Sequence, residues 1–193
     1  MASEKFEKFL GLLRKAPRPE RVNVEQMRVF QDKAGGRFPA GVTGTPVDVD
    51  GTPAEWIDPA GGATDRAVLY LHGGGYVAGS IDSHRNLTGH LAAAMGCRVL
   101  ALHYRLAPEH PHPAPVQDAV KAYRWMLGQG LSAGHLMIAG DSAGGGLTLA
   151  TLLALRDGGD ALPATAVGIS PWVDMEGTGE SAVTRAEADP MIS

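Results

Sequence analysis

Four runs of consecutive apolar residues stand out in the pattern of hydrophobic and polar positions after residue 66. Continuous runs of this kind are typical of parallel strands that are buried on both faces of a sheet. Helical stretches separate the runs, and alternation of strand and helix predicts an α/β fold. The predicted strands are residues 67–71, 98–103, 136–139 and 164–169, and the predicted helices lie near residues 84–95, 115–128 and 143–156.

The N-terminal part of the chain has a different pattern. Apolar residues at helical spacing predict an amphipathic helix over residues 3–15, and a weaker period predicts a second helix over residues 22–33. Residues 45–57 instead alternate around Asp50-Gly51, a pair that favours a type I′ turn between antiparallel strands. We therefore expect two helices, then an antiparallel hairpin at the edge of a mostly parallel sheet.

Composition narrows the class of protein further. The 193 residues are 44% hydrophobic and 20% charged, with a net charge of −4, which fits one globular domain and offers no broad basic surface for nucleic acid. The single Cys97 excludes an intrachain disulfide and a multi-cysteine metal site. Because no long apolar stretch or secretory signal pattern occurs, a cytoplasmic protein without stable membrane anchoring is expected.

The segment Gly140-Asp141-Ser142-Ala143-Gly144 lies between a predicted apolar strand and a Leu-rich helix. The pattern G-x-S-x-G in this setting is typical of a nucleophile elbow, in which a serine stands at the tip of a strained turn. Its neighbours must be small because strand and helix backbones approach closely there. The alternative from the residues alone is a Gly-rich turn in which Ser142 merely caps the helix.

A second glycine-rich segment, His72-Gly73-Gly74-Gly75, follows an earlier predicted strand. Consecutive glycines allow backbone N–H groups to turn toward a common point, where they can stabilise a developing oxyanion. A flexible loop tip or a phosphate-binding turn is the alternative, although the run does not have the G-x-G-x-x-G spacing. The two motifs in this order, each at the end of a strand, are more specific than either alone.

Four motifs together resemble the hormone-sensitive-lipase-type esterases, the bacterial family IV carboxylesterases of the α/β-hydrolase fold. The resemblance covers essentially the whole chain. The motifs are residues 72–80 with His84, residues 104–111, residues 140–145 and residues 170–174.

The resemblance implies a role for each residue of the two glycine-rich motifs. Ser142 would be the nucleophile, and the N–H groups of Gly74, Gly75 and Ala143 would form the oxyanion hole. His72 and Gly73 would support the oxyanion loop. Short- to medium-chain acyl esters are the implied substrates, with no cofactor and no metal.

The resemblance also implies a division of the chain. Residues 1–40 would be N-terminal cap helices, and residues 41–193 an incomplete α/β-hydrolase core. Within that core, residues 175–193 would lead into a second cap segment, and the C-terminal strands of the fold are expected to be missing.

A serine nucleophile needs a general base and an acid that orients the base. In this fold the chain order is serine, acid, histidine, and no histidine follows Ser142 in the sequence. Asp174 lies where some α/β-hydrolases carry their acid, whereas Asp189 matches a cap segment. The catalytic acid and histidine are therefore expected to be absent, and the 193-residue chain alone is predicted to be inactive or nearly so.

The remaining polar residues indicate no second chemistry. The histidines before Ser142 are interpreted as structural or solvated, and Arg105 and Glu109 are expected to form a buried ion pair. A small-molecule ester is the only partner expected, and the oligomeric state is left open. Two alternatives remain: a non-catalytic, small-molecule-binding relative on the same scaffold, and an amidase or lactonase that uses the same groups.

Overall fold

The computed structural model describes residues 3–15 and 23–185, which fall into two compact units. One unit, residues 23–173, contains the whole sheet and α2 (Val24–Ala34), a helix expected to belong to the cap. The other unit contains α1 (Glu4–Lys15) and α6 (Glu180–Thr184). Within the described ranges, no helix is both long and apolar enough to cross a membrane.

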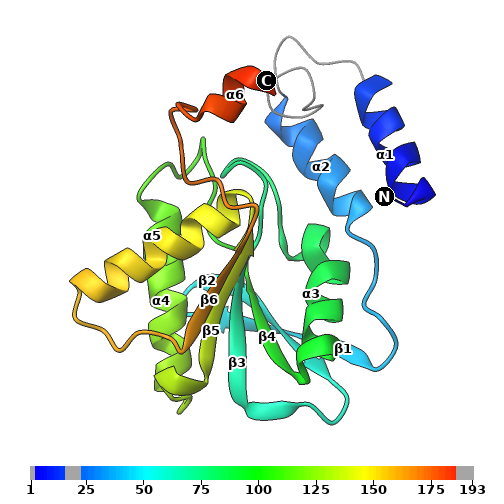
Figure 1. Ribbon diagram of the computed structural model, residues 1–193. Coiled ribbons are helices and arrows are strands. Elements are labelled where there is room, and N and C mark those ends of the chain that lie inside the picture. Colours follow the sequence, from blue (N-terminus) through cyan, green and yellow to red (C-terminus); the bar gives the residue numbers. More distant parts are fainter. Residues whose placement is uncertain (1–2, 16–22, 186–193) are drawn as a thin grey trace. The chain divides into compact units, whose positions relative to one another are not determined.

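The sheet has six strands in the order β1-β2-β4-β3-β5-β6, shown in Figure 1. The hairpin of β1 and β2 is antiparallel and pairs antiparallel with β4, whereas the pairs from β4 to β6 are parallel. The predicted α/β sheet with an antiparallel N-terminal edge is therefore confirmed. The strands are β1 (Val42–Val49), β2 (Thr52–Pro59), β3 (Ala63–Leu71), β4 (Cys97–Leu102), β5 (Leu136–Asp141) and β6 (Thr165–Ile169).

The turn between β1 and β2 has the expected geometry. Asp50 and Gly51 both have positive φ angles, 48° and 84°, as a type I′ turn requires. The side chain of Asp48 accepts a hydrogen bond of 2.7 Å from the Gly51 amide, which closes the turn.

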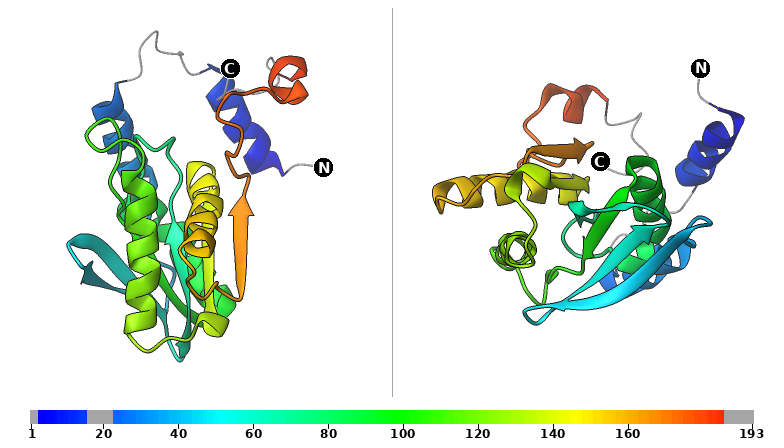
Figure 2. Two further views of the ribbon diagram at one scale, coloured as in Figure 1. Left: turned by 90° about the vertical axis from the view of Figure 1, so that its left-hand side faces the viewer. Right: turned by 90° about the horizontal axis from the view of Figure 1, so that it is seen from below.

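Helices cover both faces of the sheet in the unit formed by residues 23–173, as Figures 1 and 2 show. Val68 and Tyr70 of β3 face a core that includes α3, and Leu69 and Leu71 face a core that includes α4 and α5. This alternation explains the continuous apolar run of β3, because each successive side chain is buried on one face or the other. The helices are α3 (Ile81–Met95), α4 (Ala114–Gly128) and α5 (Ala143–Asp157).

The sheet brings the two glycine-rich motifs together at the carboxyl ends of its parallel strands. Strands β3 and β5 are parallel neighbours, and Leu71 pairs with Gly140 at their carboxyl ends. The loop after β3 and the turn after β5 therefore leave the sheet side by side, at the edge where α/β folds place their ligands.

Candidate active site

Ser142 stands at the sharp turn between β5 and α5 in a strained backbone conformation, with φ 51° and ψ −119°. Three backbone hydrogen bonds hold it there: its amide donates to Ile169 O at 2.9 Å, and its carbonyl accepts from Trp172 N at 2.8 Å and Gly146 N at 3.1 Å. The side chain makes no capping hydrogen bond. The helix-cap alternative therefore does not fit, whereas the strained serine of an elbow does.

Glycines beside Ser142 allow the backbones to approach closely. A Cβ at Gly144 would collide with the carbonyl oxygens of Leu71 and His72, and one at Gly140 would collide with Leu71 O and Gly144 O. The start of α5 therefore abuts the point where β3 becomes the oxyanion loop. This contact requires the small residues of the G-x-S-x-G pattern.

The loop after β3 turns its backbone through two positive φ angles, 125° at Gly74 and 64° at Gly75. The carbonyl of Gly74 accepts hydrogen bonds from Val77 N at 3.2 Å and Ala78 N at 2.9 Å. Toward the rest of the described chain, the amides of Gly74, Gly75 and Ala143 donate no hydrogen bond. These three N–H groups are therefore available to an acceptor from outside the described chain.

His72 is buried beneath this loop, with an exposed fraction of 2%. Its Nδ1–H donates to Gly73 O at 2.9 Å, and its ring stacks on that of Tyr104 at 4.3 Å. Burial lowers the pKa of His72 to about 3, so the ring is neutral and is a poor general base. The Tyr104 hydroxyl donates to His72 O at 2.6 Å and fixes the start of the loop.

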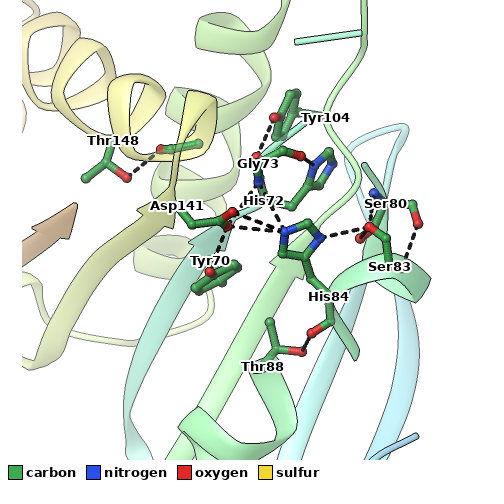
Figure 3. Close-up of polar contacts among 11 residues, drawn as sticks. Tyr70, His72, Gly73, Ser80, Ser83, His84, Thr88, Tyr104, Asp141 and Thr148 are labelled. Carbon is green, nitrogen blue, oxygen red and sulfur yellow. Dashed lines mark hydrogen bonds and ion pairs between the residues drawn. The ribbon is translucent and has the colours of Figure 1, made fainter. Parts of the chain in front are cut away.

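Asp141, next to the serine, points its carboxylate back under the oxyanion loop (Figure 3). Oδ1 accepts hydrogen bonds from Tyr70 Oη at 2.9 Å and from Gly73 N at 3.0 Å, and it lies 3.3 Å from His84 Nε2. Burial raises the pKa of Asp141, but the interactions with His84, Tyr70 and Gly73 outweigh burial and leave the pKa lowered. The sequence predicts a structural role for Asp141 and does not indicate these partners.

No histidine serves as a base for Ser142 within the described residues. The Ser142 side chain has no hydrogen bond to any of them, and no group of three or more potential ligands there is arranged to hold a metal ion. Asp174 belongs to the other compact unit, where it accepts from Gly179 N at 3.0 Å and Thr178 Oγ1 at 3.1 Å. Asp189 lies outside the described residues.

The expected ion pair between Arg105 and Glu109 is wrong. Arg105 pairs with Asp118 of α4 at 2.9 Å, and that carboxylate is 1% exposed. Glu109 is 54% exposed and accepts two hydrogen bonds of 2.8 Å from Arg28 of α2. Asp118 also accepts a hydrogen bond of 2.9 Å from the Arg105 backbone amide. A buried carboxylate needs such hydrogen bonds because it is cut off from water, whereas the exposed Glu109 has no such need.

Comparison with known proteins adds to this geometry. Residues 68–193 match the model of a family described as alpha/beta hydrolase fold. The chain belongs to this family. An acetyl-hydrolase from Streptomyces hygroscopicus is 48% identical over 196 residues, which cover 100% of this α/β hydrolase and 64% of that protein. An ethyl acetate hydrolase from Pseudomonas putida is 50% identical over 101 residues, which cover 50% of this chain and 30% of that one.

Solved structures agree with the family assignment. EstE5, in a crystal soaked with p-nitrophenyl butyrate, matches with a TM-score of 0.94 and 48% identity over 98% of this chain and 65% of that chain. An esterase from the bacterial hormone-sensitive lipase family matches with a TM-score of 0.93 and 45% identity over 100% of this chain and 66% of that chain. The resemblance to hormone-sensitive-lipase-type esterases is therefore confirmed. This α/β hydrolase spans about two thirds of the length of these relatives.

Proposed function

We propose that this α/β hydrolase acts on carboxylic esters through an acyl-enzyme formed on Ser142. The observation that carries the proposal is the strained backbone of Ser142, whose side chain makes no capping hydrogen bond. It follows β5 at the carboxyl end of the sheet, where the amides of Gly74, Gly75 and Ala143 lack acceptors within the described chain. Because the Ser142 side chain makes no capping hydrogen bond, it does not stabilise the start of α5. Such strain is retained where it positions a reacting atom.

The proposed reaction has two steps. Ser142 Oγ loses its proton to a base and bonds to the ester carbon, and the carbonyl electrons move onto the oxygen that faces the three amides. Collapse of this intermediate breaks the bond to the alcohol oxygen, which leaves with a proton, and forms the acyl-enzyme. Water then attacks the acyl carbon, releases the carboxylic acid and restores Ser142.

The amides of Gly74, Gly75 and Ala143 provide the electrostatic part of this chemistry. Each hydrogen bond to the oxyanion contributes a factor of about 10² to 10³ in kcat. The Ala143 amide also begins α5, so the positive end of the helix dipole adds to the same field. The neutral His72 below the loop contributes shape rather than charge.

Residues 143–193 contain no histidine that could take the proton of Ser142. We propose that the catalytic acid and histidine are absent from this chain and that the 193 residues alone turn over little or no ester. The same lack of a base would slow hydrolysis of the acyl-enzyme, so any acyl group transferred to Ser142 would accumulate.

The proposed substrates are esters of short or medium acyl chains, with no cofactor. The acetyl-hydrolase and ethyl acetate hydrolase names of the relatives support small acyl groups. The missing histidine also favours a second candidate, a non-catalytic protein that binds a small molecule on the same scaffold. The intact oxyanion loop and strained serine support the esterase proposal over that candidate.

Acylation by p-nitrophenyl acetate in the presence of added imidazole tests the proposal. Imidazole replaces the missing base in both steps, so the reaction is stopped with acid before the acyl group is hydrolysed, and mass spectrometry of the digested protein locates the acetyl group. The esterase proposal expects one acetyl group on Ser142, in an amount that saturates with ester, and none at this site in Ser142→Ala. Ser132→Ala, at an extended residue before β5, should be acetylated on Ser142 like the parent.

The outcomes separate the candidates. Saturable ester binding without acetylation of Ser142 would favour the non-catalytic candidate. Rapid turnover by the chain without imidazole, abolished by Ser142→Ala, would contradict the proposed absence of a base.

A further inference from the structure

The oxyanion loop needs an external anchor. Gly73, Gly74 and Gly75 carry no Cβ, so steric repulsion does not choose the direction of their amides. Two anchors are local, namely the His72 ring on Gly73 O and the turn that engages Gly74 O. The amide of Gly73 is held instead by Asp141, a residue 68 positions away.

The Asp141 carboxylate joins the two halves of the site. Its backbone immediately precedes Ser142, and its side chain binds the amide of Gly73, the residue before Gly74. A Cβ at Gly73 would collide with Asp141 Oδ2, so this contact depends on glycine at that position. One short side chain therefore sets the separation between the turn that carries the serine and the loop that carries the amides.

Two further side chains hold this carboxylate in place, as Figure 3 shows. Tyr70, 1% exposed, donates to Oδ1 at 2.9 Å from strand β3. His84 of α3 lies 3.4 Å from Oδ2 through Nε2, and its Nδ1 lies 2.8 Å from Ser83 Oγ. Nε2 of His84 also lies 3.3 Å from the Gly73 nitrogen, so the ring contacts both the carboxylate and the amide that the carboxylate binds.

Within the described residues, no hydrogen bond or ion pair joins this cluster to the Ser142 hydroxyl. Its members are therefore positioning residues rather than a second base and acid. The His84 ring continues the cluster to Ser83, which forms the capping box of α3 with Ser80. The loop is thereby tied to three elements, β3, β5 and α3.

We propose that Asp141, held by Tyr70 and His84, is the group that positions the oxyanion amides against Ser142. The inference rests on the proposed ester hydrolysis. Displacement of a catalytic group by about 1 Å costs a factor of about 10². Asp141→Asn should therefore lower the maximal rate of Ser142 acylation in imidazole by about 10- to 100-fold. The ester concentration at half-maximal rate should stay nearly unchanged, because the ester need not touch Asp141.

Asp118→Asn is the matched control. Asp118 is a carboxylate that, like the part-buried Asp141, accepts from a backbone amide, but it is 1% exposed, pairs with Arg105 and serves the loop after β4. It should lower the free energy of unfolding without slowing acylation. Tyr70→Phe removes one hydrogen bond and no carbon atoms, and should give a smaller fall in rate in the same direction.

NMR gives a readout that does not depend on ester chemistry. In the 15N-labelled chain, Asp141→Asn should move the Gly73 amide proton upfield and speed its exchange with solvent, and Asp118→Asn should do neither. If the parent is not acylated, the proposed function fails. The shift and exchange rate of the Gly73 amide proton still test whether Asp141 holds this loop. An unchanged acylation rate or an unchanged Gly73 amide in a folded Asp141→Asn variant would overturn the inference. If Asp141→Asn does not fold, the same two measurements on Tyr70→Phe decide.

Discussion

Replacement of Ser142 by glycine should stabilise the fold while it abolishes acylation. The backbone of Ser142 lies at φ 51° and ψ −119°, a region that residues with a Cβ rarely adopt. Its hydrogen bonds to Ile169, Trp172 and Gly146 keep it there despite the strain. Ser142→Ala removes the hydroxyl but keeps the Cβ, and Ser142→Gly removes both. A comparison of the two variants therefore isolates the strain from the loss of the hydroxyl.

The expected magnitude follows from two opposing effects. A strained residue of this kind costs about 1–3 kcal/mol of folding free energy. Glycine releases that strain but gains freedom in the unfolded chain, which costs about 0.5–1 kcal/mol. Ser142→Gly should therefore have a free energy of unfolding higher than that of Ser142→Ala by about 1 kcal/mol, and by no more than about 2.5 kcal/mol.

Ser132 offers a matched site without strain. It has φ −84° and ψ 145°, and its side chain makes no capping hydrogen bond. There Gly should be less stable than Ala by about 0.5–1 kcal/mol. Urea unfolding followed by circular dichroism measures both differences. If the difference between Gly and Ala has the same sign at both sites, the backbone strain at Ser142 does not exist and this reasoning is refuted.

Two further predictions concern stability. Gly144→Ala should lower the free energy of unfolding, measured in urea, by about 2 kcal/mol, because the added Cβ meets carbonyl oxygens that cannot rotate away. Gly128, at the end of α4, has open space around it, so Gly128→Ala should raise the free energy of unfolding by up to about 1 kcal/mol. Arg28 lowers the pKa of Glu109 from 4.5 to about 2, so the pair stabilises the fold above pH 4.5 and this contribution is lost as the pH falls toward 2. Arg28→Met should flatten the dependence of Tm on pH across that window, and a parent-like curve would contradict the contribution of the pair.

Local pattern was enough to locate most of the secondary structure. The apolar runs mark β3, β4 and β5 because the residues of those runs are buried on both faces of the sheet, whereas β6 is an equally apolar run that lies at the sheet's end and is mostly exposed. Asp50-Gly51 marks the hairpin because its backbone requires positive φ. The order of strands in the sheet was not predictable in this way. Strand β4 lies between β2 and β3, a pairing that depends on contacts between segments far apart in the sequence.

The failed ion pair shows the same limit for side chains. Arg105 and Glu109 are close in sequence, and that proximity led to the expectation that they pair. In the fold, Asp118 of α4 is buried beside Arg105, while Glu109 turns outward to Arg28 of α2. Partner choice depends on distance and burial in space, which neighbouring positions in a loop do not specify.

The sequence by itself identified the residues that we propose for ester hydrolysis. Ser142 and the glycines of the two motifs were recognisable because a strained turn and a close backbone approach admit few residue types. Only the tertiary structure decided how these motifs are held together. The Asp141 carboxylate meets Tyr70, Gly73 and His84 because β3, β5 and α3 converge at one sheet edge, and hydrogen bonds form between neighbours in space rather than in sequence.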